Sequence, residues 1–371
     1  MTSHQPERCD TEKRRYTATG SDAVEAAIDR DQRLVSQGVA KSAFSELVES
    51  VVMIGGYARG EGGYLVRDSE PGAYNDYDYF VVLKDAAKTK LPAIRELLTK
   101  IARELEIEVR VEVDFFPLLE SDISQLPFTL MYAEMQAGNR VIHGRNDILS
   151  SMPAMPLDAA PDDEFKRLLL NRGTLLLFNQ KNIAAETLED LDEFNKFINK
   201  AVLAIGDSIL HRNGRYHVSY RVKQQRLREV ATTSAELVEL YERAVNHKFE
   251  PGSAVLDVAE LVPLHNRVVQ LWRGEFSQHA NRVQRSKVTP QAAIAKLRNL
   301  AINIRDLGLA KVLVTPILSL TYPRELLYLS LPILLDANSR DVEELRRLLR
   351  TDLKNWPGLV ERYTSLWYRY S

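Results

Sequence analysis

Three stretches of sequence decide the fold of this chain: VVMIGGYARGEGGYL (residues 51–65), YNDYDYFVVL (residues 74–83) and VRVEVDFFPL (residues 109–118). Each contains a short apolar or alternating run of the kind that is typical of a β-strand. The first run ends at Gly55 and Gly56, and glycine is common where the main chain turns sharply or passes close to a ligand. These strands, with a helix between the last two, predict a small mixed α/β domain.

The residues after the glycine pair are expected to begin a helix. Free N–H groups at the start of a helix, together with its dipole, attract phosphate oxygens. Gly55 and Gly56 have no Cβ atom, so phosphate groups could approach the main chain there. Arg59 follows in the same turn, where its guanidinium would either strengthen this attraction or fix the turn through a hydrogen bond.

The second and third stretches carry the acidic residues of the candidate site. Asp76 and Asp78 are two positions apart at the start of an apolar strand, so both carboxylates project from one face. Asp114 lies on the next predicted strand, and it completes a cluster of three carboxylates if that strand is adjacent. Hard divalent cations such as Mg²⁺ take oxygen ligands of this kind together with substrate phosphates. Three aspartates around two ions would form a two-metal site for phosphoryl chemistry.

This combination resembles the polymerase-beta-type nucleotidyltransferase superfamily over about residues 45–150. The family pattern is an apolar strand, a Gly-Gly or Gly-Ser pair, a helix start, an Asp-any-Asp strand and a third aspartate on a later strand. The positions that match it are Gly55, Gly56, Asp76, Asp78 and Asp114. The stretch AEMQAGNRVIHG (residues 133–144) is also similar to the segment that closes the catalytic domain in many members.

The resemblance implies a Mg²⁺-dependent enzyme that transfers a nucleoside monophosphate from an NTP to a hydroxyl acceptor and releases pyrophosphate. Asp76 and Asp78 would hold two Mg²⁺ ions, with Mn²⁺ as an alternative, and Asp114 would share the second ion and assist deprotonation of the hydroxyl. ATP is the first expectation for the NTP. A small-molecule acceptor is favoured over an RNA end, a protein side chain or a second nucleotide, and a cleft between two domains is its expected place.

The helical region resembles the family less closely. Residues 199–227 are similar to helices that pack beside the nucleotide in small-molecule nucleotidyltransferases, where lysines often touch the triphosphate. Lys200 and Lys223 are therefore candidate nucleotide-binding residues, although both could equally belong to solvated helix faces. Two features depart from the family pattern: Gly56 stands where many members have serine, and residues 66–74 lengthen the gap before Asp76 as an expected inserted loop.

The chain is expected to divide into three parts. Residues 1–20 lack apolar periodicity and predict a flexible tail, whereas residues 21–150 predict the nucleotidyltransferase catalytic domain. After the prolines of a linker at residues 151–163, helical periodicity dominates, so residues 151–371 predict a C-terminal helical domain. The expected fold class is thus α+β, a small mixed-sheet nucleotidyltransferase domain followed by an all-α domain.

Hydrophobic periodicity also sets the expected element bounds. In the first domain it predicts helices at 21–49 and 91–105, and strands at 51–54, 76–83 and 109–116. In the second it predicts helices at 164–178, 188–211, 220–232, 234–248, 255–272, 290–306 and 341–353, with the aromatic C-terminal stretch as a further helix docked on the core.

Composition is that of an ordinary globular protein: 45% of the residues are hydrophobic and 27% are charged. The net charge of −2 gives no support to general nucleic-acid binding. Cys9 is the only cysteine, so neither an intrachain disulfide nor a cysteine zinc site can form. Neither a secretory signal nor a membrane-spanning run is evident, and a cytoplasmic protein without a membrane partner is expected.

Two other functions fit part of the pattern. A metal-dependent nucleotide-sugar glycosyltransferase also uses an Asp-any-Asp pair, but it does not need Asp114 or the glycine turn. A catalytically degenerate, nucleotide-binding regulator would act on a partner through the helical domain. The full set of three carboxylates argues against such a regulator, because a binding module does not require Asp114.

Overall fold

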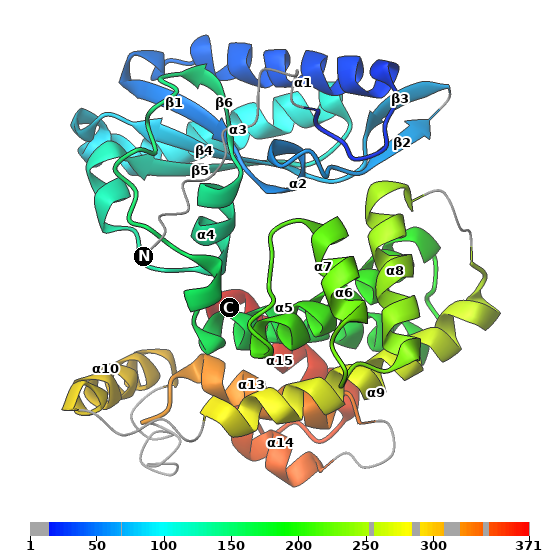
Figure 1. Cartoon of the computed structure of the whole chain (residues 1–371). Coiled ribbons are helices and arrows are strands. Elements are labelled where there is room, and N and C mark those ends of the chain that lie inside the picture. The colour runs from blue at the N-terminus through cyan, green and yellow to red at the C-terminus, as the bar shows by residue number, and fades with distance from the viewer. Residues whose placement is uncertain are drawn as a thin grey trace, which may run out of the picture. The chain divides into compact units, whose positions relative to one another are not determined.

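The chain forms an α+β structure, which confirms the expected fold class (Figure 1). The computed structural model describes residues 15–67, 69–251, 256–283, 290–307, 320–336 and 341–370. These divide into two compact units. The first, here the α/β unit, consists of the described residues of Met1–Ala160, His217–Val222 and Val245–Ala254. The second, here the helical unit, consists of those of Pro161–Tyr216, Lys223–Ala244 and Val255–Ser371.

A four-stranded mixed sheet forms the centre of the α/β unit. Its strands are β1 (Val48–Met53), β4 (Tyr77–Leu83), β5 (Val113–Leu119) and β6 (Arg140–Gly144), in the order β5-β4-β1-β6. Strand β1 pairs antiparallel with β4 and β6, whereas β4 and β5 run parallel. A parallel pair needs a crossover connection, and the helix α3 (Leu91–Val109) provides it.

Alternate residues of the central strands enter two hydrophobic cores. On one face, Met53 and Tyr79 pack in a core shared with α1 (Asp22–Ala40) and α3, and Figure 1 shows both helices along that face. On the other face, Val52 and Phe80 pack in a core shared with α4 (Leu130–Ala137). Both faces of β1 and β4 are therefore covered, which explains why their sequences are nearly continuous apolar runs.

Two element bounds in the α/β unit differ from the sequence expectation. The helix predicted at 21–49 ends at Ala40, and the 3-10 turn η1 (Ser45–Leu47) leads directly into β1, which begins before residue 51. The strand predicted at 109–116 begins only at Val113, because α3 continues to Val109. Arg110 ends this helix with a left-handed main chain, at φ 61°. Val109 is buried on the helix rather than alternating along a strand.

The expected loop at residues 66–74 is largely a β-hairpin. The strands β2 (Tyr64–Arg67) and β3 (Glu70–Ala73) pair antiparallel in a second, two-stranded sheet. Tyr57 anchors the base of this hairpin: its hydroxyl donates to the carbonyl of Gly63 at 2.5 Å and accepts from the N–H groups of Tyr74 and Asn75, each at 3.0 Å. This anchor fixes the chain immediately before Asp76 and β4.

Part of the expected N-terminal tail packs against α1. Residues 1–14 lie outside the described residues, but the main-chain N–H of Tyr16 donates to Glu25 at 2.6 Å and its hydroxyl donates to Asp29 at 3.1 Å. The carbonyl of Tyr16 accepts from the N–H of Gly62 at 3.0 Å. The segment from residue 15 onward is therefore bonded to α1 and to the turn before β2.

The described residues of the helical unit are organised around α5 (Asp162–Ala185), α6 (Leu191–Arg212) and α9 (Val258–Val283), which pack on one another. The fully buried Trp272 of α9 donates its indole N–H to the carbonyl of Leu169 at 2.9 Å. A Cβ atom at Gly173 would lie 2.3 Å from its ring, so glycine permits this close crossing. The other helices that lie wholly or partly in this unit are α7 (Tyr220–Arg228), α8 (Ala235–Phe249), α10 (Pro290–Leu307), α13 (Pro323–Leu334), α14 (Val342–Leu349) and α15 (Trp356–Tyr370).

Most of the predicted helices are present with shifted ends, and α13 had no counterpart among the predictions. The C-terminal helix α15 docks on the helical unit as expected, because the Tyr363 hydroxyl and the Thr174 hydroxyl lie 2.7 Å apart. The predicted linker at 151–163 contains the boundary between the units, after Ala160. Among the described residues, no helix is long and apolar enough to cross a membrane.

Candidate active site

The pairing of β4 with β5 sets three carboxylates side by side. Asp78 is the register partner of Asp114 in this parallel pair. Asp76 lies two residues before Asp78, immediately before β4 begins. One carboxylate oxygen from each of the three residues can be chosen so that all lie within 4.8 Å of one another. The structure thus brings together the three aspartates that the sequence singles out.

The site is partly exposed to solvent, and its three negative charges repel one another. Asp76 and Asp78 are half-buried, whereas Asp114 is exposed. Partial burial raises the pKa of the Asp114 carboxyl, and the negative charges of Asp76 and Glu112 raise it further. A raised pKa means that the ionised form of this carboxylate is disfavoured where it lies. A cation between the carboxylates would remove this penalty.

The chemistry of the donor set fits a hard divalent cation. The three side chains offer carboxylate oxygens, which are the ligands that Mg²⁺ and Mn²⁺ take in proteins. Mg²⁺ is usually bound by a few carboxylates and completed by water and substrate phosphates, so a partly open cluster suits it. Asp76, Asp78 and Asp114 are therefore the residues that would hold the ion.

Gly55 brings the main chain directly against this cluster. Its φ of 77° is left-handed, and a Cβ atom at this position would lie 3.3 Å from an oxygen of Asp78. The N–H of Ile54 donates to the carbonyl of Asp78 at 2.9 Å, which ties the turn to β4. At Gly56 a Cβ atom would lie 3.1 Å from the carbonyl oxygen of Glu61. The glycine pair therefore lets a tight turn, α2 (Gly55–Ala58), begin beside the acidic residues.

Arg59 connects this turn to α4. It is the residue at which α2 ends, and its side chain is only 9% exposed. Its guanidinium lies 3.5 Å from the carboxylate of Glu134. A Cβ atom at Gly138 would lie 2.5 Å from Cγ of Arg59, so the arginine stem packs closely against the end of α4. These contacts join the end of α2 to α4, and both roles expected for Arg59 stay predictions.

The two lysines suggested by the family resemblance belong to the helical unit. Lys223 is fully buried, and its ammonium lies 2.8 Å from the carboxylate of Asp207 and 3.2 Å from the hydroxyl of Tyr216. Asp207 also accepts from the Tyr241 hydroxyl at 2.9 Å. Lys200 is half-buried on α6. Lys223 therefore takes part in a buried network among α6, α7 and α8.

A lysine that the sequence did not single out belongs to the α/β unit. Lys248, near the end of α8, belongs to the segment Val245–Ala254 of that unit. Burial, with a smaller contribution from the charge of Arg59, lowers the pKa of Lys248 to about 8, while Asp76, Glu61 and Glu134 act in the opposite direction. Its ammonium lies 4.9 Å from the ring centre of Tyr220. The sequence does not predict that Lys248 belongs to the α/β unit. Residues 245–251 are far in the sequence from the rest of that unit, and their helical pattern does not show which unit they join.

Comparisons with known proteins assign no family to this chain. No family model, no curated protein and no solved structure matches it. The interpretation of the site therefore depends on its geometry. That geometry consists of three converging carboxylates and a glycine turn against them.

Proposed function

We propose that the α/β unit is the catalytic centre of a Mg²⁺-dependent nucleotidyltransferase. The observation that carries this proposal is the convergence of Asp76, just before β4, with Asp78 of β4 and Asp114 of the adjacent parallel strand β5, within 4.8 Å. The close approach of Gly55 to Asp78 supports it, because a bare main chain beside carboxylates leaves room for a metal-bound triphosphate. The family resemblance of these five matching positions supports the same class of enzyme.

In the proposed reaction, a hydroxyl oxygen of the acceptor forms a bond to the α-phosphorus of an NTP. The bond from that phosphorus to the bridging oxygen of the β-phosphate breaks, and pyrophosphate leaves. Bound Mg²⁺ would supply charge neutralisation at the phosphates and make the hydroxyl more acidic. Asp76 and Asp78 would bind the ions, and Asp114 would share one of them and assist removal of the hydroxyl proton.

The neighbouring residues would serve binding rather than chemistry. Gly55 and Gly56 would admit the phosphates to the main chain, and Lys248 would add positive charge on the side of Asp76. ATP remains the first candidate for the NTP and a small molecule the favoured acceptor. We also propose a cytoplasmic protein, where NTPs are abundant and a single cysteine is in keeping with a reducing compartment.

The test uses each of the four α-³²P-labelled NTPs with Mg²⁺, the full chain and an extract of the host cell. Metabolites, RNA and protein are separated afterwards. Wild type is compared with Asp114→Ala and with Asp122→Ala, a matched change of an exposed aspartate outside the cluster. Label in one fraction with wild type and Asp122→Ala, but not with Asp114→Ala, supports the proposal and names the class of acceptor.

Two outcomes would replace the proposal by one of its alternatives. NTP binding without label in any fraction would favour the nucleotide-binding regulator. Turnover of a nucleotide sugar that survives Asp114→Ala would favour the glycosyltransferase, since that chemistry does not need a third carboxylate.

A further inference from the structure

An aromatic surface continues from the acidic cluster along β5. Within this strand Asp114 and Phe116 are two residues apart, so both side chains lie on the same face of the sheet. Their register partners on β4 are Asp78 and Phe80. The carboxylates and the rings therefore form two neighbouring rows, which are separated by about 6.6 Å along the strands at roughly 3.3 Å per residue.

Phe116 is the exposed part of this surface. It is 38% exposed, whereas Phe80 beside it is only 3% exposed. The ring centres of these two residues lie 5.8 Å apart, and the ring of Tyr132 on α4 lies 5.7 Å from that of Phe80. Phe116 thus rests on a packed aromatic layer and presents apolar surface to solvent next to Asp114. Binding sites for small molecules combine aromatic side chains with a few polar groups in this way.

The order of the strands gives the site two sides. In the sheet β5-β4-β1-β6, the glycine turn follows β1 on one side of β4, and Asp114 and Phe116 belong to β5 on the other. In the proposed reaction the phosphates approach the glycine turn, and Asp114 assists removal of the proton from the acceptor hydroxyl. The β5 side is therefore the side on which the acceptor would lie.

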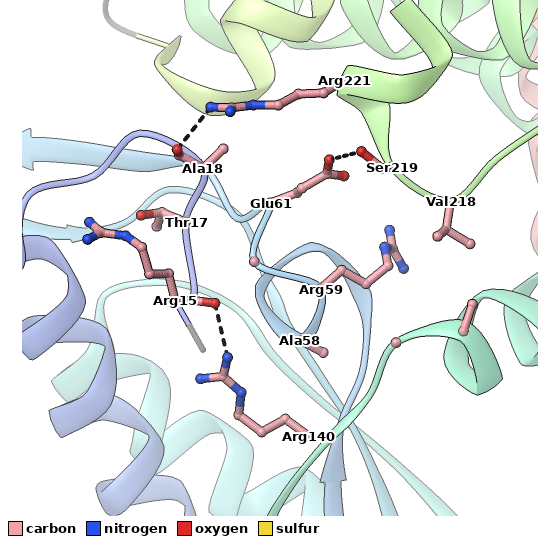
Figure 2. Close-up of a pocket in the computed structure, with 13 residues that line it drawn as sticks. Arg15, Thr17, Ala18, Ala58, Arg59, Glu61, Arg140, Val218, Ser219 and Arg221 are labelled. Carbon is pink, nitrogen blue, oxygen red and sulfur yellow. Dashed lines mark hydrogen bonds between the residues drawn. The ribbon is translucent and has the colours of Figure 1, made fainter. Parts of the chain in front are cut away.

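The surroundings of the glycine turn have a different character. The cavity beside residues 58–61 is lined by charged, polar and small side chains that bond within the protein. Figure 2 shows Glu61 directed at Ser219, whose hydroxyl donates to it at 2.6 Å, and Arg221 donating to the carbonyl of Ala18 at 2.9 Å. The described residues that line this cavity include no aromatic side chain. A flat apolar group therefore finds a stacking partner at β5 and not there.

The charges on the β5 side are negative. Partial burial raises the pKa of the Asp114 carboxyl, and the charges of nearby acidic side chains raise it further. These side chains are Asp76, Glu112 and Glu106. Glu112 is exposed and is not one of the proposed metal ligands. Negative charge beside a binding surface disfavours anionic ligands, so a phosphorylated acceptor fits this side poorly.

We propose that Phe116 binds the acceptor of the nucleotidyl transfer, and that this acceptor is a small uncharged molecule with a flat ring near its reacting hydroxyl. The inference rests on the proposed function, which puts the acceptor hydroxyl at Asp114. The ring would stack on Phe116, as aromatic groups do in offset or edge-to-face pairs. An RNA end and a second nucleotide are disfavoured as acceptors, because both carry phosphate.

The first measurement is the binding of 3-phenyl-1-propanol to the full chain without nucleotide, followed by saturation-transfer NMR. A short methylene chain separates the ring of this compound from its hydroxyl, as the two rows on β5 require. 1-Propanol lacks the ring, and 4-(3-hydroxypropyl)benzoate adds a negative charge. We expect the phenyl compound to bind, 1-propanol not to bind, and the benzoate to bind more weakly at low ionic strength. Glu112→Gln should strengthen binding of the benzoate only.

Variants of Phe116 test the role of the ring. Phe116→Ala should weaken binding of 3-phenyl-1-propanol at least about threefold, since stacked rings gain affinity beyond the area that they bury. Phe116→Trp should retain binding. The control is Tyr368→Ala, which removes an exposed aromatic ring on α15. If Phe116→Ala does not fold, Phe116→Leu provides the test, because leucine keeps apolar packing on Phe80 but cannot stack. Unchanged binding in the folded variant, or an equal loss in Tyr368→Ala, would overturn the proposal.

A transfer assay distinguishes an acceptor from the base of the NTP. With α-³²P-labelled ATP and Mg²⁺, wild type should label 3-phenyl-1-propanol, and Phe116→Ala should label it less while its affinity for ATP stays unchanged in calorimetric titration. Weaker ATP binding in Phe116→Ala would assign the ring to the nucleotide base and overturn the proposal. Label in an extract fraction, without binding or labelling of the phenyl compound, would overturn the acceptor assignment alone. Absence of label with every NTP would instead overturn the proposed function, and the acceptor assignment with it.

Discussion

The acidic residues of the two units have opposite surroundings. In the α/β unit, Asp76, Asp78 and Asp114 place three like charges within 4.8 Å, half-buried or exposed. In the helical unit, the buried Asp207 lies 2.8 Å from the ammonium of Lys223 and also accepts a hydrogen bond from a tyrosine. The first arrangement opposes folding through repulsion and the second is a compensated, closed network.

This difference separates a site from a structural pair. Removal of either member of a buried ion pair leaves an uncompensated buried charge and destabilises the fold. Such a pair can therefore be required for folding even when the intact pair contributes little net stability. Clustered like charges repel one another and do not stabilise the folded state. Carboxylates with perturbed pKa values are common at functional sites. We therefore propose a functional role for Asp76, Asp78 and Asp114 and a structural role for Lys223.

The largest expected effect is on transfer activity. Asp78→Asn removes a proposed metal ligand, and the loss should be about 10³-fold or more, since a catalytic metal is worth several kcal/mol of barrier. The free energy of unfolding, measured with urea on the same sample, should fall by no more than about 1 kcal/mol. Asp122→Asn is the matched control. Full activity in Asp78→Asn would contradict a functional role for the three clustered aspartates.

The next effect is on stability. Lys223→Met should lower the free energy of unfolding by roughly 3 kcal/mol or more, because Asp207 would stay buried without its cation. Lys181→Met, at an exposed position on α5, should leave it nearly unchanged. If Lys223→Met instead keeps its stability and loses affinity for NTP, the lysine binds the triphosphate as the family resemblance suggests, and the contrast between the units fails.

The glycine pair and the first two aspartates of the site could be predicted from the sequence, because each group lies within one short stretch of the chain. A glycine pair ends β1, and Asp76 and Asp78 stand at one strand start, so spacing alone places them. Their meeting with Asp114 required one further assumption, that β4 and β5 are neighbours, and the pairing of these strands fulfils it. Periodicity also found most of the helices.

The rest depends on packing between distant segments. Lys248 and Arg221 belong to the α/β unit although they lie within long helical patterns. Nothing in the neighbouring sequence indicates that these two segments leave the helical unit. The hairpin at β2 and β3 was missed because Pro71 and Gly72 are rare in strand interiors. The start of β5 was misplaced because Val109 and Val111 alternate with polar residues across the end of a helix.

A smaller effect should come from the metal alone. Mg²⁺ at about 100 times its dissociation constant should raise the free energy of unfolding by about 2.7 kcal/mol. The measurement is thermal unfolding with MgCl₂ against NaCl at equal ionic strength. Asp114→Asn should lose most of this gain, and Lys223 is not expected to influence it. An equal rise in wild type and Asp114→Asn would show that Mg²⁺ binds elsewhere.

The smallest effect is a pH dependence, and it tests the repulsion among the carboxylates directly. Burial and then the charge of Asp76 raise the pKa of Asp114 above its usual 3.8. Between 3.8 and the raised value the folded state therefore holds more protons than the unfolded state, so stability without metal falls as pH rises through this window.

The measurable quantity is the difference between wild type and Asp114→Asn, followed by urea unfolding in EDTA from pH 3.5 to 7. Because Asp114 is exposed, we expect a difference below about 1 kcal/mol. With Mg²⁺ the sign should reverse, because the ion binds the ionised carboxylates and its stabilisation grows as they lose their protons. A slope that keeps its sign when Mg²⁺ is added would mean that Asp114 does not contact the ion, and the acidic cluster would then be a repulsive surface rather than a metal site.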